Sequence, residues 1–104
     1  MDSGFGATAP YTVGVEEEFQ LVDPGSRRLT PVVDEVLAAG EGSRLITSEL
    51  SRSCVEMLSP VYESAADLAR ELPGLRREVR DLARSRGVEI VAAGEVAHLP
   101  AQPR

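Results

Sequence analysis

The sequence predicts an α+β fold in which helices cover one face of a largely antiparallel sheet. Short segments that alternate apolar and polar residues are typical of half-buried strands. Two longer segments repeat apolar residues at steps of three and four, which is typical of helices. Along the chain these segments follow the order β-β-α-β-β-α-β, an arrangement that favours helices on one side of the sheet. The opposite face of the sheet is then free for chemistry.

The first strand is predicted over residues 11–22, where β-branched and aromatic residues alternate with other types. The Asp-Pro-Gly-Ser sequence of residues 23–26 is a strong turn signal, because Pro presets one backbone angle and Gly accepts a positive one. We expect a short return strand through residues 28–29 to complete a hairpin. Residues 1–10 are rich in Gly, Ala and Ser and are expected to form a flexible leader.

A helix and two strands are predicted in the middle of the chain. Thr30 as N-cap and Pro31 at the first helical position indicate where the helix begins, and Gly40 indicates where it ends. The two strands are expected at residues 44–47 and 51–59, the second of them ended by a proline.

The longest helix is predicted over residues 64–86, where five apolar residues recur on one helical face. Pro73-Gly74 interrupts this stretch. Because proline removes a hydrogen bond and clashes with the preceding turn, we expect a kink or two shorter helices. Gly87 ends the helix, and residues 88–92 are the last predicted strand. The predicted organisation is therefore a domain over residues 11–94, followed by an irregular tail at 95–104, which holds two prolines.

Length and charge limit the classes of function. A chain of 104 residues forms one domain at most. Its net charge of −6 argues against nucleic acid and anionic membrane partners, which need a basic face, and is compatible with cation binding. No apolar run approaches the roughly 20 residues that span a bilayer, and we expect no signal peptide. One cysteine excludes an internal disulfide and fits a reducing cytosol, so we expect a soluble, cytoplasmic protein.

The first strand carries three consecutive glutamates. Because side chains alternate across a strand, Glu16 and Glu18 lie on one face, whereas Glu17 is the exception on the apolar face. The first two carboxylates are roughly 7 Å apart. Like charges held that close repel, and a divalent cation between or beside them makes the arrangement favourable. Oxygen ligands suit Mg²⁺ or Mn²⁺ better than Zn²⁺. The alternative is a solvated strand face, since glutamates are mostly exposed.

A related pattern occurs in residues 51–59, where Glu56 and Cys54 share the face opposite to Val55 and Met57. Glu49 comes just before this strand. If the two strands are neighbours, Glu16, Glu18, Glu49 and Glu56 would converge on one polar surface. The alternative places Glu49 in a turn and Glu56 on an ordinary surface. We interpret Cys54 as a buried filler, because no neighbouring His or Lys activates its thiol.

Residues 11–23, Tyr-Thr-Val-Gly-Val-Glu-Glu-Glu-Phe-Gln-Leu-Val-Asp, resemble the opening strand of glutamate–cysteine ligase type 2 proteins, whose pattern is Gly-hydrophobic-Glu-x-Glu. Residues 46–50 (Ile-Thr-Ser-Glu-Leu) and 55–61 (Val-Glu-Met-Leu-Ser-Pro-Val) are similar to the next acidic segment of that family. The long helix and the strand follow in the expected order. The family then continues with a Gly-Thr-His-Pro-like segment, whereas this chain reads Gly-Glu-Val-Ala-His-Leu-Pro over residues 94–100. We interpret His98 as a solvated residue.

The resemblance implies part of a glutamine-synthetase-like catalytic sheet that holds ATP and magnesium. In that chemistry ATP phosphorylates a substrate carboxylate, and an amine displaces phosphate from the acyl phosphate to give an amide. By position, Glu16, Glu18, Glu49 and Glu56 would face the metal. The implied substrates are a glutamate-like acid and an amine such as cysteine.

Members of the family run to several hundred residues, so we expect this chain to be the N-terminal part of such a ligase. Half a catalytic sheet exposes an edge, which a homo-oligomer or a complementing chain would cover. The alternative is a catalytically inactive, truncated remnant that binds a metal or a partner chain.

Overall fold

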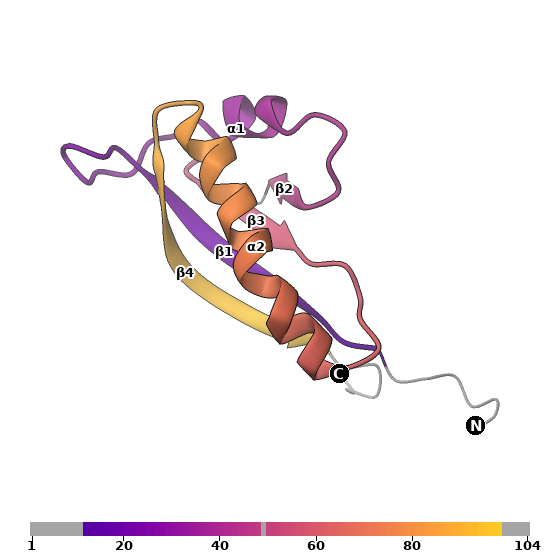
Figure 1. The fold of residues 1–104 in the computed structure, drawn as a ribbon. Helices are drawn as coiled ribbons and strands as arrows, with labels where there is room; N and C mark the ends of the chain where they lie inside the picture. Colours follow the sequence, from indigo (N-terminus) through magenta and orange to yellow (C-terminus); the bar gives the residue numbers. More distant parts are fainter. Residues whose placement is uncertain (1–11, 49, 99–104) are drawn as a thin grey trace, which may run out of the picture.

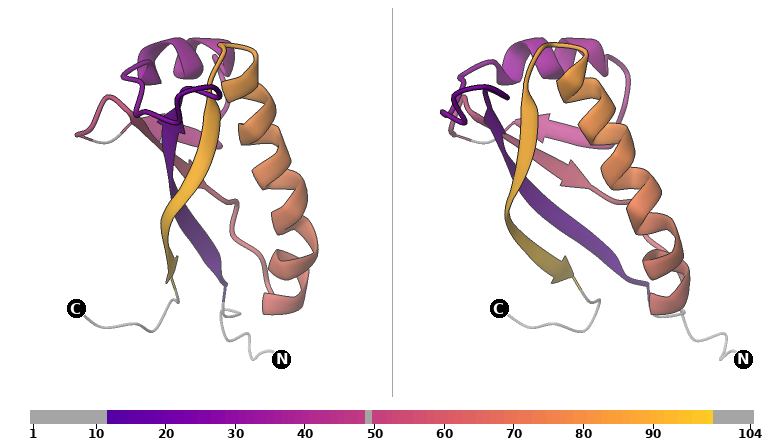
Figure 2. Two further views of the ribbon diagram at one scale, coloured as in Figure 1. Left: turned by 90° about the vertical axis from the view of Figure 1, so that its left-hand side faces the viewer. Right: turned by 60° about the vertical axis from the view of Figure 1, so that its left-hand side comes forward.

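The computed structural model describes residues 12–48 and 50–98. Its elements are β1 (Gly14–Val22), α1 (Val33–Ala39), β2 (Ile46–Ser48), β3 (Cys54–Leu58), α2 (Ala65–Arg84) and β4 (Glu89–His98). The strands form a four-stranded sheet in the order β2-β3-β1-β4, in which neighbouring strands are antiparallel. Both helices lie on one side of this sheet (Figures 1 and 2). The predicted fold class is therefore confirmed.

The core lies between the helices and the face of the sheet that they cover. Helix α1 packs on β2 and β3, and α2 packs beside β4 and α1. The core is built mainly from aliphatic side chains, as the scarcity of aromatic residues requires. Its buried members are Val15, Phe19, Leu21, Val33, Val36, Leu45, Ile46, Val55, Met57, Val79, Ala83 and Val88. Within the described residues, neither helix has the length and apolar character that crossing a membrane requires.

The segment after β1 is a turn without the predicted return strand. The Asp23 carboxylate accepts hydrogen bonds from two backbone amides of the turn, at 3.0 and 2.7 Å. Only an isolated bridge between Val22 and Leu29 forms at the expected place, so the prediction of a strand there is wrong. Pro31 has no backbone N–H and cannot continue the ladder. The observed order is therefore β-α-β-β-α-β.

Helix α1 begins at Val33, later than predicted. Val32 is its N-cap, without a side-chain hydrogen bond, so the assignment of Thr30 as N-cap and Pro31 as first helical residue is wrong. The Thr30 hydroxyl instead donates to a carbonyl of the preceding turn, at 3.1 Å. The helix ends at Gly40, as predicted.

Helix α2 is one continuous element of 20 residues. Ser64 caps it by accepting a hydrogen bond from the Asp67 amide at 3.0 Å. The predicted division into two shorter helices at Pro73 does not occur. Pro73 has no N–H to donate to the Ala69 carbonyl, four residues earlier in the helix. Both residues are exposed, so water can hydrogen-bond to that carbonyl instead. Gly87, with a φ of 81°, terminates the helical segment in the left-handed conformation that glycine tolerates.

Strand β4 is longer than predicted and extends into the segment that was expected to be an irregular tail. It pairs with β1 along its whole length, and the register shifts once. Ala92 lies opposite Phe19 and Gly94 lies opposite Glu18, so Ala93 forms a β-bulge. The bulge interrupts the two-residue alternation of side chains from which strands are predicted, while the backbone pairing continues on both sides of it. Residues 99–104 and the predicted leader at 1–10 lie outside the described residues.

Candidate functional site

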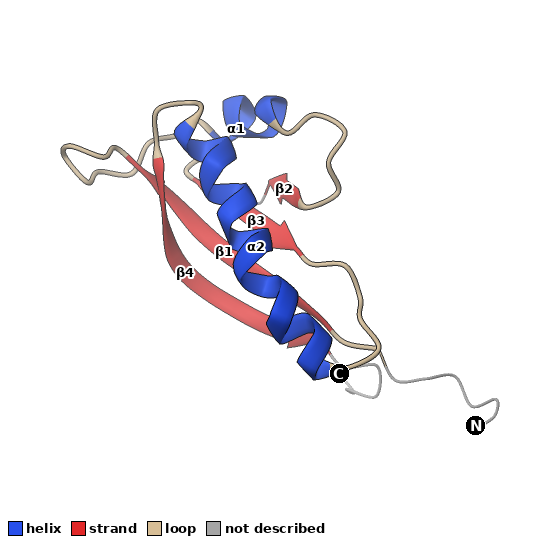
Figure 3. Ribbon diagram, viewed as in Figure 1, coloured by secondary structure: helices blue, strands red, loops and turns tan. Residues whose placement is uncertain are grey.

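Strands β1 and β3 are neighbours in the sheet (Figure 3). On the face turned away from the helices, both strands carry acidic residues. The register places Glu18 directly opposite Glu56 and places Glu16 opposite Leu58. Directly opposed residues of an antiparallel pair point to the same side, with Cβ atoms about 4.5–5.5 Å apart. Glu18 is exposed, whereas Glu16 and Glu56 are half-buried. Three of the four predicted metal ligands thus share one face.

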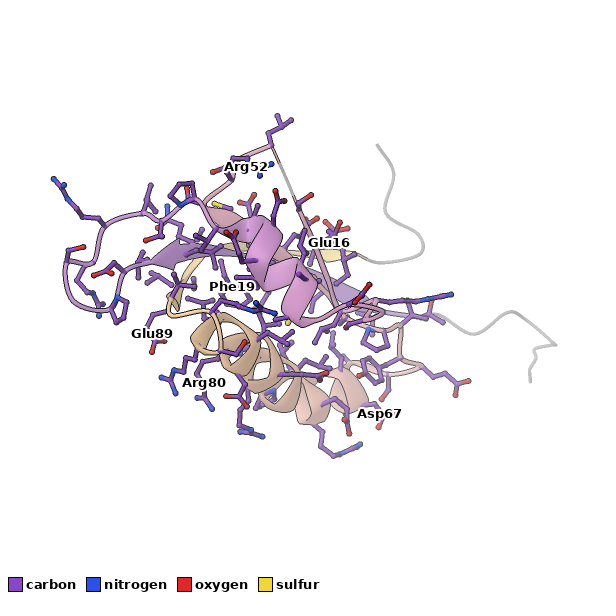
Figure 4. The ribbon with its side chains drawn as sticks, turned by 90° about the horizontal axis from the view of Figure 1, so that it is seen from above. Glu16, Phe19, Arg52, Asp67, Arg80 and Glu89 are labelled. Carbon is purple, nitrogen blue, oxygen red and sulfur yellow. The ribbon has the colours of Figure 1, made fainter. Side chains whose placement is uncertain are left out.

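We call this surface the acidic face. Besides the three glutamates, the acidic face includes Gln20 of β1, which is paired with Cys54 of β3. It also includes Thr47 of β2, which is paired with Glu56. Seen from above, Glu16 and the α2 residues Asp67 and Arg80 lie on opposite sides of the sheet (Figure 4). Cys54 is a free thiol and half-buried rather than fully buried as the filler interpretation assumed.

The acidic face does not by itself form a three-ligand cage. Among the described residues, no group of three or more His, Cys, Asp or Glu side chains is arranged to hold a metal ion. Glu49, the fourth predicted ligand, lies outside the described residues. The register therefore establishes a carboxylate pair, Glu18 and Glu56, with Glu16 farther along the same strand face.

The chemistry of this pair fits a hard divalent cation. Carboxylates directly opposite each other on a sheet repel, and a cation beside them relieves the repulsion. Mg²⁺ is usually held by one or two carboxylates together with phosphate oxygens and water, rather than by a cage of protein ligands. A paired Glu18 and Glu56 on an open face is thus a donor set that Mg²⁺ or Mn²⁺ can use.

The β-bulge of β4 lies beside this pair, because Gly94 is the register partner of Glu18. Bulges increase the local twist and re-aim neighbouring side chains, and they are common next to functional sites. The sequence analysis missed this bulge. The one available signal was the run of small residues Ala92, Ala93 and Gly94 in the middle of the strand.

Glu17 points to the opposite, helix-covered face, and the structure explains why a charge occurs there. Its side chain is 6% exposed. Its carboxylate accepts hydrogen bonds from Arg76 Nε, at 2.8 Å to Oε1 and 3.1 Å to Oε2, and Oε2 also accepts one from Nη2. Such a two-point ion pair fixes both distance and orientation. It ties β1 to α2 and holds the strand with Glu16 and Glu18 facing outward.

Sequence reasoning missed the role of Arg76, although a signal was present. Arg76 follows Leu72 by four residues and precedes Val79 by three, so the helical period places it on the buried stripe of α2. One basic residue on an apolar helix stripe and one acidic residue on an apolar strand face predict each other as partners, since buried charges are paired.

Comparisons with known proteins identify the family of the chain. A sequence profile described as glutamate-cysteine ligase family 2 (GCS2) matches residues 12–103. A protein of Rubrobacter xylanophilus, named "Putative glutamate--cysteine ligase 2-3", is 55% identical over 104 residues, which cover 97% of this chain and 29% of that protein. Two proteins named "Putative glutamate--cysteine ligase 2" are also similar. The one from Sorangium cellulosum is 39% identical over 81% of this chain and 24% of its own length. The one from Herpetosiphon aurantiacus is 33% identical over 82% and 23%, respectively.

The chain thus spans less than a third of the length of each of these three relatives. The profile match, by contrast, covers most of this chain and includes β1 and all the other described strands and helices. The predicted resemblance is therefore confirmed, and the chain belongs to glutamate-cysteine ligase family 2.

Proposed function

We propose that the acidic face is one wall of the magnesium–ATP site of an ATP-dependent carboxylate–amine ligase of the glutamate–cysteine ligase type. The reaction would join a glutamate-like acid to an amine such as cysteine through an acyl phosphate. One observation carries the proposal: the register sets Glu18 opposite Glu56 on the face of the sheet that no described helix covers. Membership of the family supports the type of reaction.

In this proposal Glu18 and Glu56 hold Mg²⁺ or Mn²⁺, and Glu16 adds negative charge beside them. Glu49 is the fourth proposed ligand. A bound divalent cation supplies positive charge that offsets the phosphates of ATP during transfer to a carboxylate. The residues of this chain contribute by placing carboxylate oxygens on a rigid strand pair, so that little reorganisation is needed when the cation binds.

The Glu17–Arg76 pair contributes indirectly. A one-residue slip of a strand exchanges its two faces. Burying Glu18 in place of Glu17 would leave Arg76 with a partner, but it would also expose Val15 and Phe19 and bury Glu16. The apolar alternation of β1 therefore selects the register that exposes the proposed metal ligands, and the Glu17–Arg76 ion pair fastens β1 to α2 within that register.

The test is a titration of the 104-residue chain with MgCl₂ and with Mg-ATP in a calorimeter. We expect Glu18→Gln and Glu56→Gln each to weaken Mg²⁺ binding at least about tenfold, because each removes one charged ligand. Glu71→Gln is the matched control, since Glu71 is exposed on α2, away from the acidic face. Equal affinity in wild type and both acidic-face variants would refute the site.

A second readout locates the ion. Mn²⁺ broadens NMR signals of nearby nuclei, so substoichiometric Mn²⁺ is expected to broaden the amides around Glu18 and Glu56 before those of α2. Turnover is tested separately, by ADP release in the presence of glutamate and cysteine. Metal binding without ADP release would favour the alternative of an inactive chain that binds a metal or a partner, and would leave the metal site in place.

A further inference from the structure

A pocket of about 550 Å³ lies between α2 and the ends of β2 and β3. Leu75 and Glu78 of α2 form one wall. Arg44 and Leu45 before β2, together with Leu58 at the end of β3, form the other. That second wall is held together by a hydrogen bond from the Leu58 amide to the Leu45 carbonyl, at 2.7 Å. The volume of the pocket falls within the usual range for small-molecule sites.

The surface of the pocket is mostly apolar. Leu45, Leu58, Pro60 and Leu75 contribute hydrocarbon, and Leu45 is almost fully buried. Ser59 also lines it, but its hydroxyl is already engaged. Ser59 Oγ accepts a hydrogen bond from an amide of the chain at 2.9 Å and donates one to the Pro60 carbonyl at 2.8 Å. The side-chain groups that remain for a ligand are therefore two charges.

Those charges are the guanidinium of Arg44 and the carboxylate of Glu78, which come from the two different walls. Neither makes a hydrogen bond or an ion pair with any of the described residues, including each other. Most arginines of α2, by contrast, are engaged: Arg70 with Asp67 and Arg84 with Glu89, for example. An apolar pocket with a few polar groups that fix orientation is the usual form of a ligand site.

We propose that this pocket binds a small zwitterion with an apolar body, which is the chemistry of an apolar amino acid or dipeptide. The ligand carboxylate pairs with Arg44, whose guanidinium suits two-point recognition. The ligand ammonium pairs with Glu78, and the apolar side chain lies against Leu45 and Leu75. None of Glu16, Glu18 and Glu56 lines the pocket, and the proposal requires neither metal nor ATP, so it stands or falls independently of the proposed ligase function.

The experiment is an NMR titration of the ¹⁵N-labelled 104-residue chain with leucine and with the dipeptide Leu-Leu. Saturable shifts are expected at Leu45, Leu75 and Glu78. Two analogues remove one charge each: N-acetyl-leucine lacks the ammonium, and leucinamide lacks the carboxylate. Each analogue is expected to bind about tenfold more weakly, since it loses one charge-assisted hydrogen bond.

Variants then assign each charge to its partner. Arg44→Gln is expected to weaken the binding of leucine about tenfold and to leave the binding of leucinamide unchanged. Glu78→Gln is expected to weaken the binding of leucine likewise and to leave the binding of N-acetyl-leucine unchanged. Arg77→Gln and Glu71→Gln are matched controls, since both residues are exposed on α2 and do not line the pocket. Circular dichroism checks that each variant is folded, and the analogues test the same pairing on the unmodified chain.

The relative affinities of leucine and Leu-Leu decide between a free amino acid and a peptide as the occupant. No saturable binding of either compound would overturn the proposal. It would also be overturned if the singly charged analogues bound as tightly as leucine, or if the control variants lost as much affinity as Arg44→Gln and Glu78→Gln.

Discussion

The two faces of β1 place the same residue type in opposite settings. Glu17 is buried under α2 and paired with Arg76, whereas Glu18, the next residue, is exposed on the acidic face opposite another glutamate. The covered face tolerates a charge only with a partner, because removing a carboxylate from water costs several kcal/mol, on the order of the stability of a small domain. The open face tolerates two carboxylates side by side because water screens them.

This contrast separates a glutamate that fastens β1 to α2 from the glutamates that are proposed to bind a cation. A carboxylate already bonded at two points to a guanidinium is saturated on that side, so Glu17 is a structural group. Glu18 and Glu56 face each other with like charge, so a cation would gain from both. Burial alone would have selected Glu17, which is already paired with Arg76, as the candidate metal ligand.

The largest expected effect sharpens the contrast between the faces without involving charge. Phe19→Ala removes a 5%-exposed core side chain from the covered face and is expected to lower the free energy of unfolding by about 3–5 kcal/mol. Gln20→Ala, one residue along on the acidic face, is expected to change it by less than about 0.5 kcal/mol. Urea unfolding followed by circular dichroism measures both.

Glu17→Gln is expected to have the next largest effect. The amide keeps the shape of the carboxylate but presents a donor to the donors of Arg76, so unfolding should become about 1–3 kcal/mol easier. This loss is smaller than is usual for breaking a fully buried ion pair, because the Arg76 side chain is 42% exposed and stays partly hydrated.

A double variant tests whether the cost arises from the loss of the Glu17 carboxylate as a partner of Arg76. Glu17→Met combined with Arg76→Met removes both charges, and replacing an ion pair by apolar residues is often neutral. The double variant should therefore be more stable than Glu17→Gln in the same urea experiment. A double variant that is less stable would mean that the pair itself, beyond the need to satisfy Arg76, stabilises the fold.

The elements that the sequence predicted well are those with a strong period. The alternation of β1 and the repeat of Leu68, Leu72, Leu75 and Val79 in α2 correspond to the two sides of the observed core. The errors occur where backbone pairing or solvation outweighs side-chain pattern. Pro73 was expected to divide α2, but its side of the helix faces water, and β4 continues past a bulge that hides its alternation.

For the candidate site, alternation was sufficient to separate Glu16 and Glu18 from Glu17. That Glu18 lies opposite Glu56 could not be predicted, because it depends on the register of β1 with β3, which a single sequence does not contain. The partner of Glu17 could have been predicted from the phase of Arg76 on the helix. The convergence of Glu49 with the other three stays a prediction, because Glu49 is outside the described residues.

A smaller effect of opposite sign is expected on the acidic face. Glu18→Gln removes one of two directly opposed like charges and should raise the free energy of unfolding by a few tenths of a kcal/mol, roughly, in metal-free buffer. Added MgCl₂ should stabilise the wild type and stabilise this variant less, since a ligand stabilises only the state that binds it. Thermal unfolding with and without MgCl₂ measures both changes. A Glu18→Gln variant that is destabilised as strongly as Glu17→Gln would remove the distinction between the faces.

The smallest expected effect concerns pH at the start of α2, on the solvent side of the covered face. A hydrogen bond from Arg70, and secondarily one from Ser64, lowers the pKa of Asp67 below its ordinary value of 3.8. A depressed pKa in the folded state means that the stabilisation is fully present above the unfolded pKa and is lost as pH falls through the folded one. Asp67→Asn should therefore cost stability at about pH 6, and this cost should shrink at about pH 3, below the ordinary pKa, where the unfolded chain takes up a proton on Asp67 more readily than the folded one. Urea unfolding at both pH values tests the sign, and a cost that grows on acidification would contradict it. The Asp67 carboxylate is hydrated, whereas that of Glu17 is buried. Asp67→Asn should therefore lower the free energy of unfolding at pH 6 by less than Glu17→Gln does.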